Sequence, residues 1–122
     1  MSKLSKSATI REIYAAYLSK DCSVVERLLA SDFTFTSPSD DAIDKDVYFR
    51  KCWPNSERML RFDIEQIFER GNEAFVTYKI LNNDGKEFRN TEFFCFDGDK
   101  VRSIDVYFGA THKDGVFVEQ QA

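Results

Sequence analysis

The sequence has little of what metal sites and disulfide frameworks require. Its 122 residues include one histidine, His112, and three cysteines that stand far apart with no CxxC pair. Zinc sites need closely spaced Cys and His ligands, and no pair of acids stands at ligand spacing either. The number and wide spacing of the cysteines therefore predict that they are reduced thiols, and no metal site is expected. Neither GxxxxGK nor GxGxxG occurs, so there is no phosphate-cradling loop, and we expect no cofactor.

Positive charge is also scarce. The chain has 17 Lys+Arg against 21 Asp+Glu, a net charge of -4, and the charges are interspersed. This pattern argues against nucleic acid and anionic membranes as partners, and it leaves small neutral or cationic ligands open. No apolar run approaches the ~18 residues of a membrane span, and the N-terminus MSKLSKSATI has no apolar signal region. We therefore expect a cytoplasmic protein.

Large apolar side chains, in contrast, are abundant. The composition is 43% hydrophobic and includes 12 Phe and 5 Tyr, so aromatic burial should drive folding. A chain of this length supports one core and leaves little room for a second. We expect a single domain over residues 1–122, with a core at about 10–109 and a looser C-terminal tail.

Three helices are predicted in the first half of the chain. Residues 10–18 carry apolar side chains at helical spacing, with Thr9 and Glu12 in capping-box positions. A second, shorter helix follows Asp21 and ends near Ala30. A third is expected between Asp41, as its N-cap, and Pro54.

Strands dominate the remainder. A short strand alternates Phe and Thr over 33–36, and it is stopped by Ser37 and Pro38. Four more are predicted at about 61–69, 73–81, 86–96 and 100–109, separated by RGN, NNDG and DGD turns. The strand at 86–96 is unusually long, so the antiparallel sheet should curl. The three helices are the elements available to cover its concave side.

This order resembles the NTF2-like superfamily, in particular its SnoaL-like and ketosteroid-isomerase-like branches. The resemblance rests on LLASDFTFTSP between helices and on FFCFDGDKVRSIDVYFG at the end of the meander, and it spans about 10–109. It is closest to small members without an assigned reaction. It implies an α+β cone, with the helices on a strongly curved, mainly antiparallel sheet. It also implies a pocket, frequent homodimers, and functions from isomerases to plain binding domains.

Glu92 is the leading candidate for chemistry. Strand alternation places it on one face with Phe88, Asn90, Phe94 and Phe96. A carboxyl group desolvated by aromatic neighbours has a raised pKa and can donate a hydrogen bond near neutral pH. In the ketosteroid isomerases that the chain resembles, an acid in the corresponding segment has this role. The alternatives are that Glu92 pairs with a nearby cation or faces water.

The other functional residues of that family have no clear counterparts in this sequence. Its general base is an aspartate immediately before the proline that follows the first strand, and Ser37 occupies this position. A serine without an activating base cannot abstract a carbon-bound proton, so steroid isomerisation is not expected. Asp40 is a candidate base. The family's oxyanion tyrosine falls nearest Ile13, with Tyr14 adjacent; Tyr17, one turn later, is either a second donor or a core residue.

Two functional hypotheses remain open. In the first, a cavity lined by Trp53, Tyr48, Tyr78, Asn90 and Phe94 holds a small organic molecule for cofactor-free isomerisation, dehydration or hydrolysis. Glu92, Tyr17 and Asp40 would then be its catalytic residues. In the second, the domain binds a ligand or a protein without turnover. Whether the protein is an enzyme is left open, because fold alone does not decide chemistry.

Overall fold

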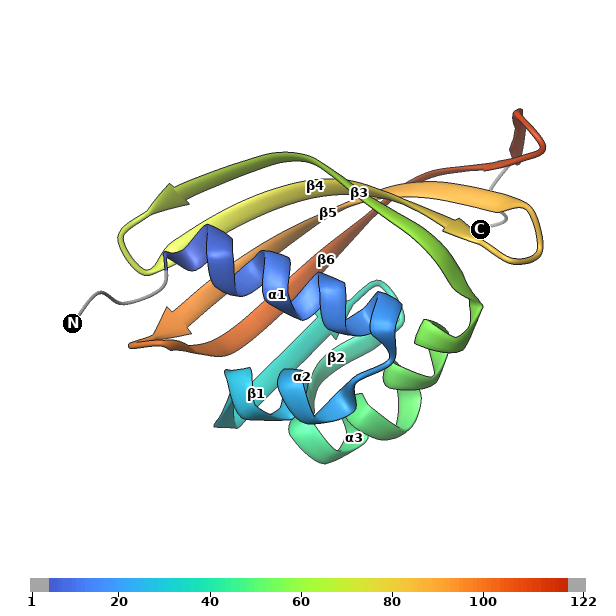
Figure 1. Ribbon diagram of the computed structural model, residues 1–122. Coiled ribbons are helices and arrows are strands. Elements are labelled where there is room, and N and C mark those ends of the chain that lie inside the picture. Colours follow the sequence, from blue (N-terminus) through green and yellow to red (C-terminus); the bar gives the residue numbers. More distant parts are fainter. Residues whose placement is uncertain (1–4, 119–122) are drawn as a thin grey trace.

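The computed structural model describes residues 5–118. Helices occupy the first half of the chain and long strands the second (Figure 1). The elements are α1 (Lys6–Ser19), α2 (Cys22–Leu28), β1 (Leu29–Ser37), β2 (Asp40–Asp44), α3 (Lys45–Lys51), the 3-10 helix η1 (Trp53–Arg58), β3 (Met59–Arg70), β4 (Glu73–Asn82), β5 (Lys86–Asp97), β6 (Lys100–Lys113) and β7 (Val116–Val118).

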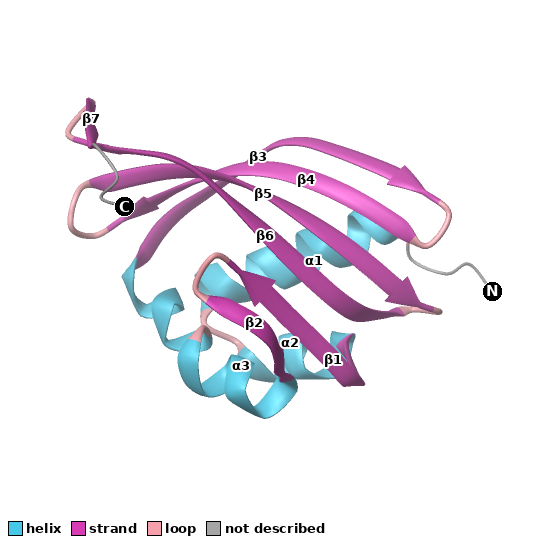
Figure 2. Cartoon of the chain, turned by 180° about the vertical axis from the view of Figure 1, so that it is seen from behind, coloured by secondary structure: helices cyan, strands magenta, loops and turns pink. Residues whose placement is uncertain are grey.

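The strands form one mixed sheet in the order β2-β1-β6-β5-β4-β3, and β7 pairs with β6. All neighbours are antiparallel except β1 and β6, which run parallel. The sheet curves around α1, which lies across its concave face (Figure 1). On the opposite, convex face, none of the described helices covers β3–β6 (Figure 2). The predicted α+β architecture, three helices on a strongly curved sheet, is confirmed.

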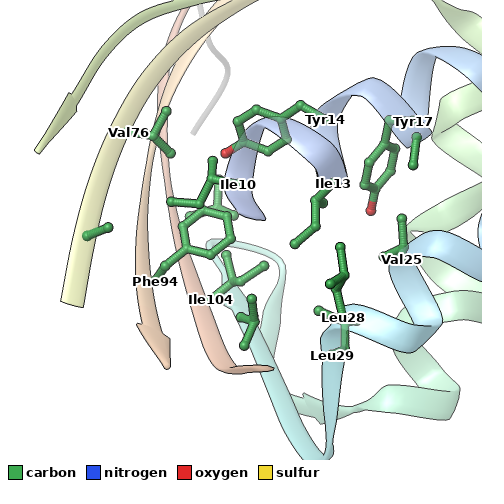
Figure 3. Packing of buried hydrophobic residues seen from close by; sticks show 14 of the residues in the cluster. Ile10, Ile13, Tyr14, Tyr17, Val25, Leu28, Leu29, Val76, Phe94 and Ile104 are labelled. Carbon is green, nitrogen blue, oxygen red and sulfur yellow. The ribbon is translucent and has the colours of Figure 1, made fainter. Parts of the chain in front are cut away.

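The core lies between α1 and the concave face of the sheet. Ile10 and Ile13 of α1 are almost completely buried and point toward Phe94 and Ile104 of the sheet (Figure 3). The same helix carries Tyr14 and Tyr17 into the interior, with their hydroxyl groups pointing inward. Aromatic burial thus forms much of the core, as the composition predicted.

Helix boundaries differ from the sequence-based expectation at two places. The first helix begins at Lys6, because the Ser5 hydroxyl accepts a hydrogen bond from the Ala8 N–H at 3.0 Å. The predicted N-cap of the third helix, Asp41, is wrong, since it lies in strand β2. Asp44 caps α3 instead, accepting from the Val47 N–H at 2.9 Å.

The last strand continues beyond Gly109, where a loose tail was expected. β6 extends to Lys113, and β7 returns alongside it, pairing Val116 with Lys113. The end of the predicted tail, residues 119–122, lies outside the described residues. Gly109 itself is required by close packing: a Cβ atom there would collide with the carbonyl oxygen of Arg89 on β5.

Candidate functional site

A cavity of about 440 Å³ opens between α1, the α3–η1 segment and the concave face of the sheet. Its walls include eight aromatic side chains, among them Tyr14 of α1, Tyr48 of α3 and Tyr78 of β4. Two polar residues of β5, Asn90 and Glu92, border it as well. The volume and lining are typical of a small-molecule site.

Glu92 lies inside this cavity wall and is 9% exposed. Its Oε1 accepts a hydrogen bond from the Tyr14 hydroxyl at 2.9 Å, and its Oε2 accepts one from the Tyr78 hydroxyl. The expected inward face of β5 is confirmed, because Asn90, Phe94 and Glu92 are all buried. Two separate elements therefore hold one carboxyl group in place.

The Glu92 carboxyl has no cationic partner among the ion pairs of the described residues. Burial raises its pKa, and the hydrogen bonds from Tyr78 and Tyr14 only partly oppose that effect. The pKa values of Tyr14 and Tyr78 are raised well above normal, mainly by burial and further by the charge of Glu92. The two hydroxyls therefore stay protonated and donate to Glu92, which holds its proton to higher pH than an exposed glutamate does.

The second predicted donor, Tyr17, does not contact Glu92. Its hydroxyl contacts the Tyr48 hydroxyl instead, and both groups border the cavity. Only one of the two hydroxyls can donate to the other, so the second proton of the pair is available to a bound molecule. The structure therefore offers two hydroxyl sites, one at Glu92 and one at this tyrosine pair.

Asp40 lies at the cavity in contact with Lys51, whose Nζ is 2.5 Å from its Oδ1. Ser37 donates to the other carboxylate oxygen at 2.9 Å. The hydrogen bond from Lys51 is the main cause of a lowered pKa for Asp40, and Ser37 adds to it. A carboxylate stabilised in this way is a weak proton acceptor, so its environment disfavours the predicted role as general base.

The predicted wall residues divide into two groups. Tyr48, Tyr78 and Asn90 border the cavity. Trp53 and Phe94 are not among its lining residues: the ring centroids of Trp53 and Tyr17 are 4.7 Å apart, and Phe94 is fully buried in the core. The expected contact of these two residues with a ligand stays a prediction.

Tyr14 is the site residue that sequence reasoning passed over in favour of Tyr17. Both tyrosines belong to the same apolar stripe of α1, so helical periodicity makes them equivalent. Only the rotation of α1 over the sheet places Tyr14 against Glu92. The available signal was its position next to Ile13, where the resemblance had located the oxyanion tyrosine.

Other reactive groups are poorly placed for chemistry. Cys52 borders the cavity, but burial raises the pKa of its thiol to about 11, so little thiolate exists near neutral pH. His112 lies on β6 against Phe117. Within residues 5–118, no group of three or more His, Cys, Asp or Glu side chains is arranged to hold a metal ion. In the same range, no helix has the length and apolarity needed to cross a membrane.

Comparison with known proteins connects this geometry to a family. A model described as a SnoaL-like domain matches residues 10–104. No curated protein sequence matches the chain. Among solved structures, an NTF2-like protein of unknown function from Cytophaga hutchinsonii has a TM-score of 0.75 at 20% identity, with 88% of this chain and 92% of that chain covered.

Two further structures are similar in the same way. An NTF2-like protein of unknown function from Burkholderia xenovorans has a TM-score of 0.69 at 17% identity, covering 93% of this chain and 85% of that chain. A protein with a ketosteroid isomerase-like fold from Catenulispora acidiphila, in complex with trimethylamine, has a TM-score of 0.69 at 10% identity, covering 86% and 88%. At these identities the likeness establishes the fold alone.

Proposed function

The chain belongs to the SnoaL-like domain family, and from its site we propose that the cavity binds a small organic molecule to which Glu92 donates a proton or a hydrogen bond. The observation that carries this proposal is the buried carboxyl group of Glu92 at the cavity wall, which accepts hydrogen bonds from Tyr14 and Tyr78. A neutral carboxylic acid in such a setting can stabilise negative charge that develops on a ligand oxygen.

The chemistry that fits best needs an acid more than a strong base. In epoxide opening, water adds to one carbon while the ring oxygen takes a proton; in dehydration, the departing hydroxyl takes a proton while the neighbouring carbon loses one. Glu92 can supply the proton to oxygen in both reactions. The resulting carboxylate accepts hydrogen bonds from Tyr14 and Tyr78 and can take a proton back. Cofactor-free isomerisation of a carbonyl compound would instead use the Glu92 carboxylate, which takes a proton from one carbon and returns it to another. The hydroxyl pair of Tyr17 and Tyr48 would hold a second polar group of the ligand.

Binding without turnover is the second candidate. It is supported by Ser37 at the position of the family's base and by the pairing of Asp40 with Lys51, which leaves no strong base at the mouth. The Catenulispora acidiphila protein, which is in complex with trimethylamine, shows that a protein of this fold holds a small organic molecule. Here Glu92 and Asn90 would orient the ligand.

A Glu92→Gln variant separates the two candidates, because it keeps the side-chain shape and removes the titratable proton. Wild-type and variant proteins would be incubated with styrene oxide, 4-hydroxy-4-phenyl-2-butanone and 3-cyclohexen-1-one, with products followed by NMR. If Glu92 is the acid, the variant loses about a hundredfold or more of the turnover. Glu87→Gln, on the outward face of the same strand, is the matched control and should keep it.

Two results would count against catalysis. Equal turnover by Glu92→Gln and wild type would remove Glu92 from the reaction. Absence of turnover on all three compounds, together with unchanged ligand affinity in the variant, would favour the binding role. Affinity can be read from the side-chain amide signal of Asn90, which borders the cavity beside Glu92.

We also propose a homodimer, in the cytoplasm, formed through the outward face of the sheet. That face carries a row of aromatic side chains across β3, β4 and β5, in which Phe68 pairs with Phe75 and Phe75 with Phe93. Phe68 is 68% exposed and Phe75 is 47% exposed. Apolar rings gathered on an uncovered sheet favour burial against another surface.

A further inference from the structure

The charged side chains that border the cavity are not all paired with one another. Four ionisable side chains of acidic or basic type line it: Asp40, Lys51, Arg58 and Glu92. Asp40 and Lys51 form a close ion pair with each other. Glu92 accepts a hydrogen bond from each of two tyrosine hydroxyls. Arg58 therefore carries a positive charge that no acidic side chain of the lining pairs with, although the whole chain carries -4.

Arg58 has no acidic partner among the described residues. Its Nη2 donates to the neutral Oδ1 of Asn55 at 2.6 Å, and no ion pair includes it. Asp84, which borders an adjoining hollow together with Arg58, accepts from the Lys86 N–H at 3.0 Å. The guanidinium group thus keeps most of its donors for another molecule.

The position of Arg58 is held by the backbone. It is the last residue of η1, and its carbonyl accepts a hydrogen bond from the Asn83 N–H at 2.8 Å, which ties it to the end of β4. The neighbouring Asn82 also lines the cavity, and its Oδ1 is enclosed without a hydrogen-bond donor among the described residues. An unmatched cation and an unmatched acceptor therefore lie at the same end of the cavity.

We infer that the ligand is an organic carboxylate whose charged group pairs with Arg58 and whose apolar body extends along the tyrosine walls toward Glu92. This inference rests on the proposed function, because it assigns the ligand class of the same cavity. A guanidinium fork matches a carboxylate in a bidentate geometry that a neutral group cannot reproduce. A hydrogen-bond donor next to the carboxylate would satisfy Asn82. Anion preference at this end is local, since the net charge of the molecule has the opposite sign.

The test compares three probes of one shape: 4-phenylbutanoate, its neutral amide 4-phenylbutanamide, and the cation 4-phenylbutylamine. Each is titrated into ¹⁵N-labelled protein, and the side-chain amides of Asn55 and Asn90 report on the two regions of the cavity. We expect the carboxylate to bind about fivefold more tightly than the amide, as suits a partly exposed ion pair. In Arg58→Gln this ratio should fall to about one while the affinity for the amide is unchanged.

Arg102→Gln is the matched control, because Arg102 is exposed on β6 and does not border the cavity. It should keep the fivefold ratio. If Arg58→Gln does not fold, a salt titration of the wild-type protein is the second measurement: the carboxylate preference should shrink as salt rises, whereas amide binding should not.

The outcomes distinguish this inference from the proposed function. Binding of both probes with an unchanged ratio in Arg58→Gln would overturn the anionic ligand and leave the cavity in place. Loss of the ratio in Lys51→Gln alone, or tighter binding of the amine than of the carboxylate, would also overturn it. If no probe shifts the Asn90 amide of the wild-type protein, the ligand cavity itself is wrong, and both proposals fall.

Discussion

At the scale of single residues, the character of Glu92 depends on what surrounds it. Period-two alternation on β5 predicted that its side chain faces inward, and its burial confirms this. The two tyrosine partners come from α1 and from β4, at sequence separations of 78 and 14. A carboxyl group with hydroxyl donors and no cation behaves differently from one in a salt bridge, because the hydroxyl donors offset the desolvation of its charge only in part.

This difference is measurable as a pH dependence of stability. Because the native pKa of Glu92 is raised above that of the unfolded chain, the native state holds its proton to higher pH than the unfolded state. The free energy of unfolding of wild type relative to Glu92→Gln should therefore be greatest below about pH 4.3. It should fall as pH rises through the native pKa and then level off. Urea unfolding of both proteins at a series of pH values measures it.

A Tyr14→Phe variant tests how the hydrogen bond from Tyr14 affects the pKa of Glu92. Loss of the Tyr14 hydrogen bond removes one of the contacts that lower the pKa of Glu92, so the decline should extend to higher pH than in wild type. A wild-type minus Glu92→Gln difference that stays flat across the acid and neutral range would show that Glu92 is not held in a desolvating site.

At the scale of elements, the segment 40–51 shows where local signals are insufficient. Asp40, Asp41 and Asp44 all precede a helical pattern, and each has the chemistry of an N-cap. In the structure, residues 40–44 pair with β1, with Ile43 opposite Phe35. The Ala42 N–H also donates to the Thr36 hydroxyl at 3.1 Å. The first part of the predicted helix therefore forms strand β2, and Asp44 is the N-cap of α3.

The stability of α3 should depend on Asp44 and not on Asp41. Replacing Asp44 by alanine removes the hydrogen bond to the Val47 N–H and should lower the free energy of unfolding by about 1 kcal/mol. Asp41→Ala, at an exposed position of β2, is the matched control and should change it by less than about 0.5 kcal/mol. Chemical denaturation provides both values. A larger loss in Asp41→Ala would mean that the helix begins where the sequence pattern alone placed it.

At the scale of the whole molecule, the two faces of the sheet differ in what they carry. Its concave face holds the core and the cavity beneath α1, whereas the face seen in Figure 2 is left uncovered by the described helices along β3–β6. That outer face carries Phe75 and Phe93, whose ring centroids are 4.6 Å apart. Tyr107 of β6, which pairs with Thr91 of β5, extends this apolar area and is 56% exposed. The proposed ligand site and the apolar surface proposed for dimerisation therefore lie on opposite faces of the same curved sheet.

The proposed homodimer can be tested by placing charge in the centre of this outer row. Phe75→Lys should convert the wild-type dimer into a monomer, because an ammonium group cannot be buried between two apolar faces without a partner. Phe117→Lys, at an exposed position of β7, should leave the dimer intact. Light scattering coupled to size exclusion gives the mass of each. A monomeric wild type, or a Phe75→Lys protein that remains dimeric, would contradict the proposed interface.

The sequence alone determined the three helices, the strands at β1 and β3–β6, the order of these elements and the inward face of the long strand, but not strands β2 and β7. These properties depend on the spacing of apolar residues, which follows the period of a helix or a strand and needs no tertiary information. The α+β class and the face of β5 on which Glu92 lies follow from that periodicity, whereas the burial of Glu92 was settled by the structure. The absence of a base at Ser37 could also be read directly from the residues.

Only the tertiary structure decided which side chains meet. Periodicity places Tyr14 and Tyr17 on one stripe, but the rotation and height of α1 over the sheet selected Tyr14 for Glu92 and Tyr17 for Tyr48. Packing likewise left Trp53 and Phe94 out of the cavity lining, and it paired Lys51 with Asp40 while no ion pair of the described residues includes Arg58. These pairings join residues far apart in the chain. They depend on distances that sequence spacing does not encode, because local propensity is indifferent to a partner that only folding brings near.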